Sequence, residues 1–132
     1  MRRAMAGILL AVAIAGCASG RADTEAASCV EEYSLKTLAD RRFAFDGTVT
    51  SIQSGEYNAN AGATPLHITF DVHQWFRGGK GGEATLEGWD FTALAQGTRV
   101  LVSGDTDTAW GCGFTRAYTI DEASQWEAAF ND

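Results

Sequence analysis

Residues 66–76 read LHITFDVHQWF, and this stretch decides the fold. Apolar and polar side chains alternate along it, which is the period of a β-strand with one buried face. The side chains expected to face the core are Leu66, Ile68, Phe70 and Val72. The side chains expected on the opposite face are His67, Thr69, Asp71 and His73. The stretch therefore predicts a half-buried strand.

The segment upstream, residues 43–53, reads FAFDGTVTSIQ and alternates in the same way. One side of this strand is expected to carry Phe43, Phe45, Gly47 and Val49. The other side is expected to carry Asp46, Thr48 and Thr50. A glycine inside a strand is typical of a bulge or a sharp bend, which a small barrel needs, so we expect one at Gly47.

Glycines mark the turns that follow these two strands. Residues 54–64 predict a loop with glycines at 55 and 62, and residues 78–82 (GGKGG) predict a tight turn. A single helical turn is expected over residues 91–96. Three more strands are expected further along the chain, at residues 84–88, 99–103 and 109–119.

Two segments have the pattern of short helices. In residues 29–42, acids fall early and arginines fall late, an order that suits the helix dipole. Residues 121–130 (DEASQWEAAF) begin with two acids and predict an amphipathic C-terminal helix. The apolar positions of the two helices are Val30, Tyr33, Leu35 and Leu38 in the first, and Ala123, Trp126 and Phe130 in the second.

Five strands with a helical turn before the fourth predict a mostly β fold. The expected architecture is a five-stranded OB-like Greek-key barrel with a short N-terminal helix and a C-terminal helix. The 132 residues are 45% hydrophobic and 20% charged, which suits one domain with a buried core and excludes a disordered chain. The side chains expected to fill the barrel are Phe45, Val49, Ile68, Phe70, Val72, Leu101 and Phe114.

The N-terminus has the parts of an export signal in the right order. Arg2 and Arg3 give a basic start, and residues 7–16 (GILLAVAIAG) carry no charge. This apolar run is shorter than the ~20 residues that a membrane-spanning helix needs. The run ends in Ile14-Ala15-Gly16-Cys17, which resembles the lipobox of bacterial lipoproteins. Two alternatives remain: a buried apolar helix that happens to end in cysteine, and an ordinary cleaved signal without lipid.

The lipobox resemblance implies that residues 1–16 are a cleaved signal peptide and that Cys17 carries the lipid. Residues 17–28 are then the lipidated cysteine and a flexible tether, whose 11 residues after Cys17 reach about 18 Å. Residues 29–132 are the OB-like barrel domain. The expected location is the extracytoplasmic face of the cell membrane or outer membrane, with the lipid on Cys17 as the membrane contact.

The chain is acidic, with 17 acidic and ten basic side chains and a formal charge of −7. Loss of residues 1–16 would remove Arg2 and Arg3 and no acid, which leaves −9. Nucleic-acid binding depends on Lys and Arg that face phosphates, so this balance argues against a nucleic-acid partner. Anionic lipid also repels such a domain, so the acyl chains have to supply the adhesion.

The chain has three cysteines. If Cys17 carries lipid, Cys29 and Cys112 remain as an even pair in an exported protein, where conditions are oxidising. A disulfide between them would close a loop of roughly 84 residues and stabilise the fold by ~4–5 kcal/mol. The alternative is two free buried thiols that behave as small apolar side chains. No cysteine or histidine cluster has metal-ligand spacing, so no metal is expected.

Four short patterns lie on the expected strands: F-x-G-x-V at 45–49, T-F-x-V-x-x-x-F-R-G at 69–78, G-x-R-V-L-V-S-G at 97–104 and C-G-F-T-R-x-Y at 112–118. Residues 29–119 thereby resemble the bacterial branch of the netrin-module and tissue-inhibitor-of-metalloproteinases group of OB-fold proteins. The resemblance implies a barrel with a cysteine-bearing N-terminal segment attached to it. It does not carry the inhibitor function over, because Cys29 is internal and no C-x-C start is present.

Four residues are candidates for facing a ligand: His67, Asp71, His73 and Trp75. The two histidines lie ~20 Å apart along an extended strand, so they cannot share one ion. The alternative for them is a solvated polar face. For the tryptophan, the alternative is a ring that plugs a barrel end. No nucleophile–base motif or phosphate-binding loop is present, so no catalytic residue and no cofactor is expected.

Together these features predict a membrane-anchored envelope lipoprotein whose barrel is a non-catalytic binding or interaction module. An envelope protein is the expected partner. Two alternatives remain open. One is a metalloproteinase-inhibitor-like protein, which should present a protruding ridge near Cys29. The other is an enzyme with an unrecognised site, which needs a pocket where titratable groups converge.

Overall fold

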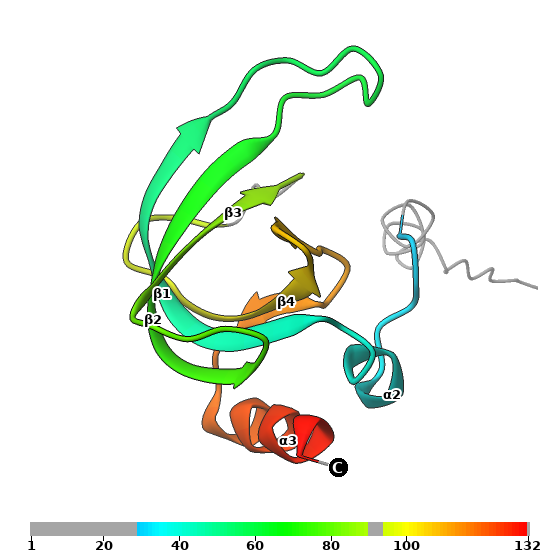
Figure 1. The fold of residues 1–132 in the computed structure, drawn as a ribbon, viewed down its shortest axis with the longest axis vertical. Helices are drawn as coiled ribbons and strands as arrows, with labels where there is room; N and C mark the ends of the chain where they lie inside the picture. The colour runs from blue at the N-terminus through cyan, green and yellow to red at the C-terminus, as the bar shows by residue number, and fades with distance from the viewer. Residues whose placement is uncertain (1–28, 90–93, 132) are drawn as a thin grey trace, which may run out of the picture.

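The computed structural model describes residues 29–89 and 94–131. Its elements, in chain order, are α2 (Leu35–Leu38), β1 (Phe43–Ser54), β2 (Leu66–Arg77), β3 (Glu83–Gly88), β4 (Arg99–Asp105), β5 (Thr108–Ala109), β6 (Thr115–Ala117) and α3 (Ile120–Phe130) (Figure 1). The expected signal peptide 1–16 and tether 17–28 lie outside the described residues. So do residues 91–93 of the expected helical turn, and residues 94–96 are not helical.

The strands close into a barrel around β1, the strand that joins its two sides. β1 pairs antiparallel with β2 along its length and with β4 over Phe43 to Thr48. β2 pairs with β3, and β5 closes the ring by pairing parallel with β3 and antiparallel with β4. β6 adds to β4 as one outer strand. The mostly β fold, an OB-like Greek-key barrel of five strands with two short helices, is as predicted.

The pairing of β1 with β2 is irregular at Gly47, as expected, but the extra residue of the bulge is His73 on β2. The register of β1 against β2 shifts between Asp46 and Gly47. A β-carbon at Gly47 would stand only 2.8 Å from the carbonyl oxygen of Asp71, so β1 can bend tightly onto β2 only with glycine here. The bend lets one long strand serve both sides of the barrel.

Two apolar clusters fill the molecule. The cluster inside the barrel contains Phe43, Phe45, Val49, Ile68, Phe70, Leu86, Val100, Val102 and Ala109, with Val72 at its edge. The second cluster lies outside the barrel wall, against the helices, and contains Leu38, Ala44, Leu101, Phe114, Trp126 and Phe130. The prediction that Leu101 and Phe114 belong to the barrel core was therefore wrong. Leu101 alternates with Val100 and Val102, so it points to the opposite face of β4.

The first half of β1 is buried on both faces, which the alternation did not predict for its polar side. Asp46 is only 4% exposed, and Ala44 packs in the cluster against the helices. Asp46 lies on the face that the C-terminal part of the chain covers, where Arg99 neutralises it. A strand covered on both sides loses the polar-out pattern.

The N-terminal helix is much shorter than the expected 29–42. Only Leu35 to Leu38 is helical, after a capping box formed by Ser34 and Thr37. Residues before Ser34 are held in a non-helical path by contacts with distant segments. Cys29 is bonded to Cys112, and the hydroxyl of Tyr33 accepts a hydrogen bond of 2.9 Å from the indole of Trp126.

The expected fifth strand over 109–119 is in fact two short strands, β5 and β6, with a turn between them. Two consecutive residues in this turn have left-handed backbone angles, Cys112 with φ 57° and Gly113 with φ 97°. A strand cannot continue through such angles. The turn lets β5 close the barrel while β6 runs along the outside of β4.

The C-terminal helix α3 agrees with the prediction. The side chain of Thr119 caps it by accepting a hydrogen bond from the backbone of Glu122. Trp126 and Phe130 are buried and Ala123 packs beside them, so these three residues form its inner face. No helix within the described residues has the length and apolar character to cross a bilayer.

Candidate functional site

The hairpin formed by β1 and β2 extends beyond the barrel. β4 covers β1 only as far as Thr48, whereas pairing with β2 continues to Ser54 opposite Leu66. The loop that joins the two strands stands out at the end of the molecule opposite α3 (Figure 1). Asn58 and Ala63 form a bridge in this loop, and the side-chain oxygen of Asn58 accepts a 3.0 Å hydrogen bond from the backbone of Ala61.

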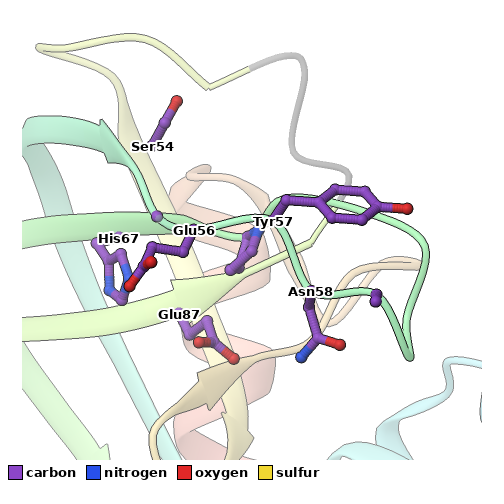
Figure 2. Close-up of a pocket in the computed structure, with 9 residues that line it drawn as sticks. Ser54, Glu56, Tyr57, Asn58, His67 and Glu87 are labelled. Carbon is purple, nitrogen blue, oxygen red and sulfur yellow. The ribbon is translucent and has the colours of Figure 1, made fainter.

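A pocket of about 760 Å³ lies where this loop meets the outer face of β2 and β3. We call it the hairpin pocket (Figure 2). Its lining comes from three segments: the end of β1 with the loop, the start of β2, and the end of β3. The residues that line it are Ser54, Gly55, Glu56, Tyr57, Asn58, Ala59, Pro65, His67 and Glu87.

His67 lies between two strands and beneath the loop. In the sheet it stands opposite Gln53 of β1 and Glu87 of β3. A β-carbon at Gly55 would stand 2.7 Å from Nε2 of His67, so the backbone of the loop passes directly against the imidazole. The ring therefore contributes to the wall of the hairpin pocket at the point where the loop leaves the sheet.

Four side chains that line the hairpin pocket are not used to hold the fold. Within residues 29–89 and 94–131, the side chains of Glu56, Tyr57, His67 and Glu87 make no hydrogen bond and no ion pair. Tyr57 is 66% exposed and points along the loop away from His67 (Figure 2). The hairpin pocket thus offers carboxylates, an imidazole and an aromatic ring that can all meet a ligand.

The structure places the other three candidate residues elsewhere. Nε2 of His73 lies 2.8 Å from the hydroxyl of Thr48. Asp71 is exposed on the same strand face. The indole of Trp75 donates a 2.9 Å hydrogen bond to the carbonyl of Gly81, and its ring packs on Phe45 at 4.9 Å between centroids. Of the four candidates, only His67 therefore borders the hairpin pocket.

Trp75 faces inward because of a register shift. Val72 pairs with Gly47 and Gln74 with Asp46, so His73 is the extra residue of a bulge. One extra residue reverses the alternation for the rest of a strand. Trp75 therefore joins the barrel cluster as a partly buried ring, which matches the alternative of a ring that plugs the barrel.

The sequence analysis missed the loop side chains Glu56, Tyr57 and Asn58. Loop residues have no apolar period, so alternation cannot detect them. One signal was available, because the loop over residues 54–64 is longer than the two to five residues that usually join a hairpin. Long loops often carry binding residues.

A bidentate ion pair lies at the opposite, helix-covered side of β1. Arg99 donates to both carboxylate oxygens of Asp46, from Nε at 2.9 Å and from Nη2 at 2.7 Å. These hydrogen bonds raise the pKa of Arg99 above its ordinary value, so the guanidinium stays charged. Arg99 also stacks over Tyr118 at 3.8 Å. All of its contacts are internal, and they join β1, β4 and the segment before α3.

The end of the molecule near the disulfide carries a second pocket of about 570 Å³. Cys29 and Cys112 form the disulfide, with their Cα atoms 5.9 Å apart. Val30 beside it is 86% exposed. Arg41 lies behind this surface, buried, with Nη2 3.1 Å from Glu31 and its guanidinium over the ring of Trp110 at 3.8 Å. These contacts fasten the N-terminal segment to the barrel.

Within the described part of the chain, no three His, Cys, Asp or Glu side chains are grouped as metal ligands. No protein-family model matches the sequence, and no curated protein is significantly similar to it.

Proposed function

We propose that the chain is a membrane-anchored lipoprotein of the bacterial envelope that acts as a non-catalytic binding module, with the hairpin pocket as its binding site. One observation carries the proposal: the hairpin pocket stands on the part of the sheet that leaves the barrel, and four of the side chains that line it make no hydrogen bond and no ion pair within the described residues, namely Glu56, Tyr57, His67 and Glu87. Polar side chains that make no hydrogen bond within the fold are available to hydrogen-bond a ligand.

The arrangement of side chains in the hairpin pocket favours recognition over turnover. A general base needs to reach the proton it removes, and a nucleophile needs such a base beside it. Ser54 and His67 both line the hairpin pocket, but no hydrogen bond joins them. Exposed Tyr57 is of the residue type that interfaces use as an anchor.

The membrane anchor is proposed from the N-terminal sequence. The order of Arg2-Arg3, the uncharged run 7–16 and the lipobox ending at Cys17 supports a lipid on that cysteine. Residues 17–28 would then join the lipid to the barrel. A domain held in this way searches only a shallow layer above the membrane, so its effective concentration toward a partner in the same layer is high.

The test is affinity capture from solubilised envelope with the full-length chain as bait. Tyr57→Ala and Glu87→Gln, both in the hairpin pocket, should lose the captured partner. Glu83→Gln should keep it, because Glu83 lies on the same strand β3 but outside the hairpin pocket.

Two results would contradict this function. Loss of capture in Val30→Asp, with Tyr57→Ala unaffected, would move the contact to the disulfide end and favour the metalloproteinase-inhibitor-like alternative. Turnover of a substrate by the purified chain on a hydrolase panel, abolished by His67→Ala, would favour an enzyme.

A further inference from the structure

The hairpin pocket has hydrogen-bond donors and acceptors that the described residues leave unused. Glu56 and Glu87 are acceptors. The side-chain oxygen of Asn58 is occupied by Ala61, which leaves its amide nitrogen as a donor. The hydroxyl of Ser54 and the imidazole of His67 can act in either role. A cationic side chain would use only the acceptors and an anion only the donors, whereas a hydroxyl group uses both at once.

The shape of the hairpin pocket suits a small oligomer more than a single small molecule. Its volume of about 760 Å³ lies within the range of ligand sites, and it opens broadly to solvent. Tyr57, 66% exposed at the rim, presents an aromatic face to which the C–H face of a pyranose ring can stack. Stacking at the rim and hydrogen bonds inside would hold successive sugar units.

The position of the hairpin pocket narrows the ligand class further. The face of strands 2 and 3, together with the loop between strands 1 and 2, is where OB barrels bind oligonucleotides and oligosaccharides. His67 and Glu87 stand on that face, and Glu56 and Tyr57 belong to that loop. Two carboxylates in the hairpin pocket and a chain charge of −7 repel a phosphodiester backbone, which leaves the saccharide.

We propose that the hairpin pocket binds an uncharged oligosaccharide. The inference rests on the proposed function and adds the chemistry of the ligand. Glu56 and Glu87 accept hydrogen bonds from sugar hydroxyls, Asn58 donates to a ring or hydroxyl oxygen, and Tyr57 stacks on a sugar ring. His67 borders the bound sugar from the sheet, in the wall of the hairpin pocket.

The experiment is isothermal titration calorimetry of the full-length chain in detergent. The probes are three uncharged trisaccharides, namely maltotriose, cellotriose and triacetylchitotriose, together with a sulfated heparin trisaccharide and the peptide trilysine. The chain is compared with Glu87→Gln, which keeps the shape but removes the charged acceptor, and with Tyr57→Ala, which removes the stacking face. The matched control is Glu83→Gln, the same change on an exposed residue of β3 outside the hairpin pocket.

At least one uncharged trisaccharide should bind. Its affinity should fall by about ten-fold or more in Glu87→Gln and in Tyr57→Ala. A hydrogen bond to a charged group and an aromatic contact each contribute enough binding free energy for a change of that size. Glu83→Gln should stay within about two-fold.

Three results would overturn the inference: no binding of any uncharged trisaccharide, binding that the two hairpin-pocket variants leave unchanged, or binding of trilysine or the sulfated probe alone. If envelope capture still depends on Tyr57 and Glu87 while the trisaccharides fail, the proposed function stands and the saccharide is wrong. If the hairpin-pocket variants also leave envelope capture unchanged, both the proposed function and the saccharide inference are wrong.

Discussion

The imidazole of His67 lies against the backbone of Gly55, so closely that a β-carbon at Gly55 would stand 2.7 Å from Nε2 of the ring and 3.2 Å from the carbonyl oxygen of Pro65. The amide of Gly55 also donates a 2.8 Å hydrogen bond to that carbonyl. A larger residue at this position would have to displace the His67 ring. The contact ties the start of the loop to β2 and so shapes the hairpin pocket.

Gly55→Ala should push the His67 ring out of its place and weaken ligand binding. We expect a loss of about 1 kcal/mol in unfolding free energy, because a surface side chain can move out of the way. The NMR signals of the imidazole should shift. Gly82→Ala is the matched control, since a β-carbon there meets nothing within 4 Å, and it should change stability by no more than about 0.5 kcal/mol. Unchanged imidazole signals in Gly55→Ala would contradict the contact.

Phe70→Ala should cost about 3–5 kcal/mol of unfolding free energy, because Phe70 is fully buried in the barrel and its removal leaves a cavity. His67→Ala, on the outer face of the same strand, should stay within about 0.5 kcal/mol. Urea denaturation of both variants gives the comparison. Equal stability of the two would show that the faces of β2 are assigned the wrong way round.

Asp46→Asn should lower the unfolding free energy by about 2 kcal/mol, since it breaks a bidentate pair in which the carboxylate is buried and accepts two hydrogen bonds from Arg99. Asp71→Asn makes the same change on an exposed residue of the neighbouring strand and should have an effect below about 0.5 kcal/mol. The denaturant midpoints of the two variants, compared with that of the unchanged protein, measure the two effects. An unchanged unfolding free energy in Asp46→Asn would mean that the ion pair contributes no net stability.

Cys29 and Cys112 should be found as one linked peptide pair in mass spectra of the unreduced protein. Reduction should lower the denaturation midpoint, because the bond closes a loop with a sequence separation of 83 residues. Chain entropy alone predicts a stabilisation of ~4–5 kcal/mol. Two thiols that react with an alkylating agent in the folded, unreduced protein would contradict the bond.

Cys17→Ser should release the protein from membranes or block its processing, because the serine hydroxyl cannot take the thioether-linked lipid. Membrane fractionation and metabolic labelling with a fatty acid measure the two effects. Cys29→Ser is the control, since it changes another cysteine and should leave the label in place. A Cys17→Ser protein that still carries label and still fractionates with membranes would remove the anchor from the proposal.

Alternation predicted the fold where a strand has one buried face, as in Ile68 and Phe70 of β2, and the helical period of Trp126 and Phe130 predicted α3. It failed where the period is broken or absent. The bulge at His73 reverses the faces beyond it, so Trp75 turns inward. β5 has only two residues, too few to show any period.

The assignment of Leu101 and Phe114 to the barrel failed for a different reason. The molecule has two apolar clusters that share the wall of the barrel, and an apolar side chain in the sequence does not reveal which cluster it joins. The sequence did not reveal the hairpin pocket for a similar reason. Glu56 and Tyr57 line the same pocket as His67 only because the loop lies over the start of β2, a path that depends on the space at Gly55.

The most direct test of the central claim, that the chain works by binding through the hairpin pocket, is site-specific photo-crosslinking in intact cells. p-Benzoylphenylalanine placed at Tyr57 should give crosslinked products on irradiation if the ligand binds at the hairpin loop, as we propose. The same residue placed at Asp121, an exposed position in the first turn of α3, should give none, because α3 lies at the opposite end of the molecule from the hairpin loop (Figure 1). Products at Asp121 and none at Tyr57 would contradict the account.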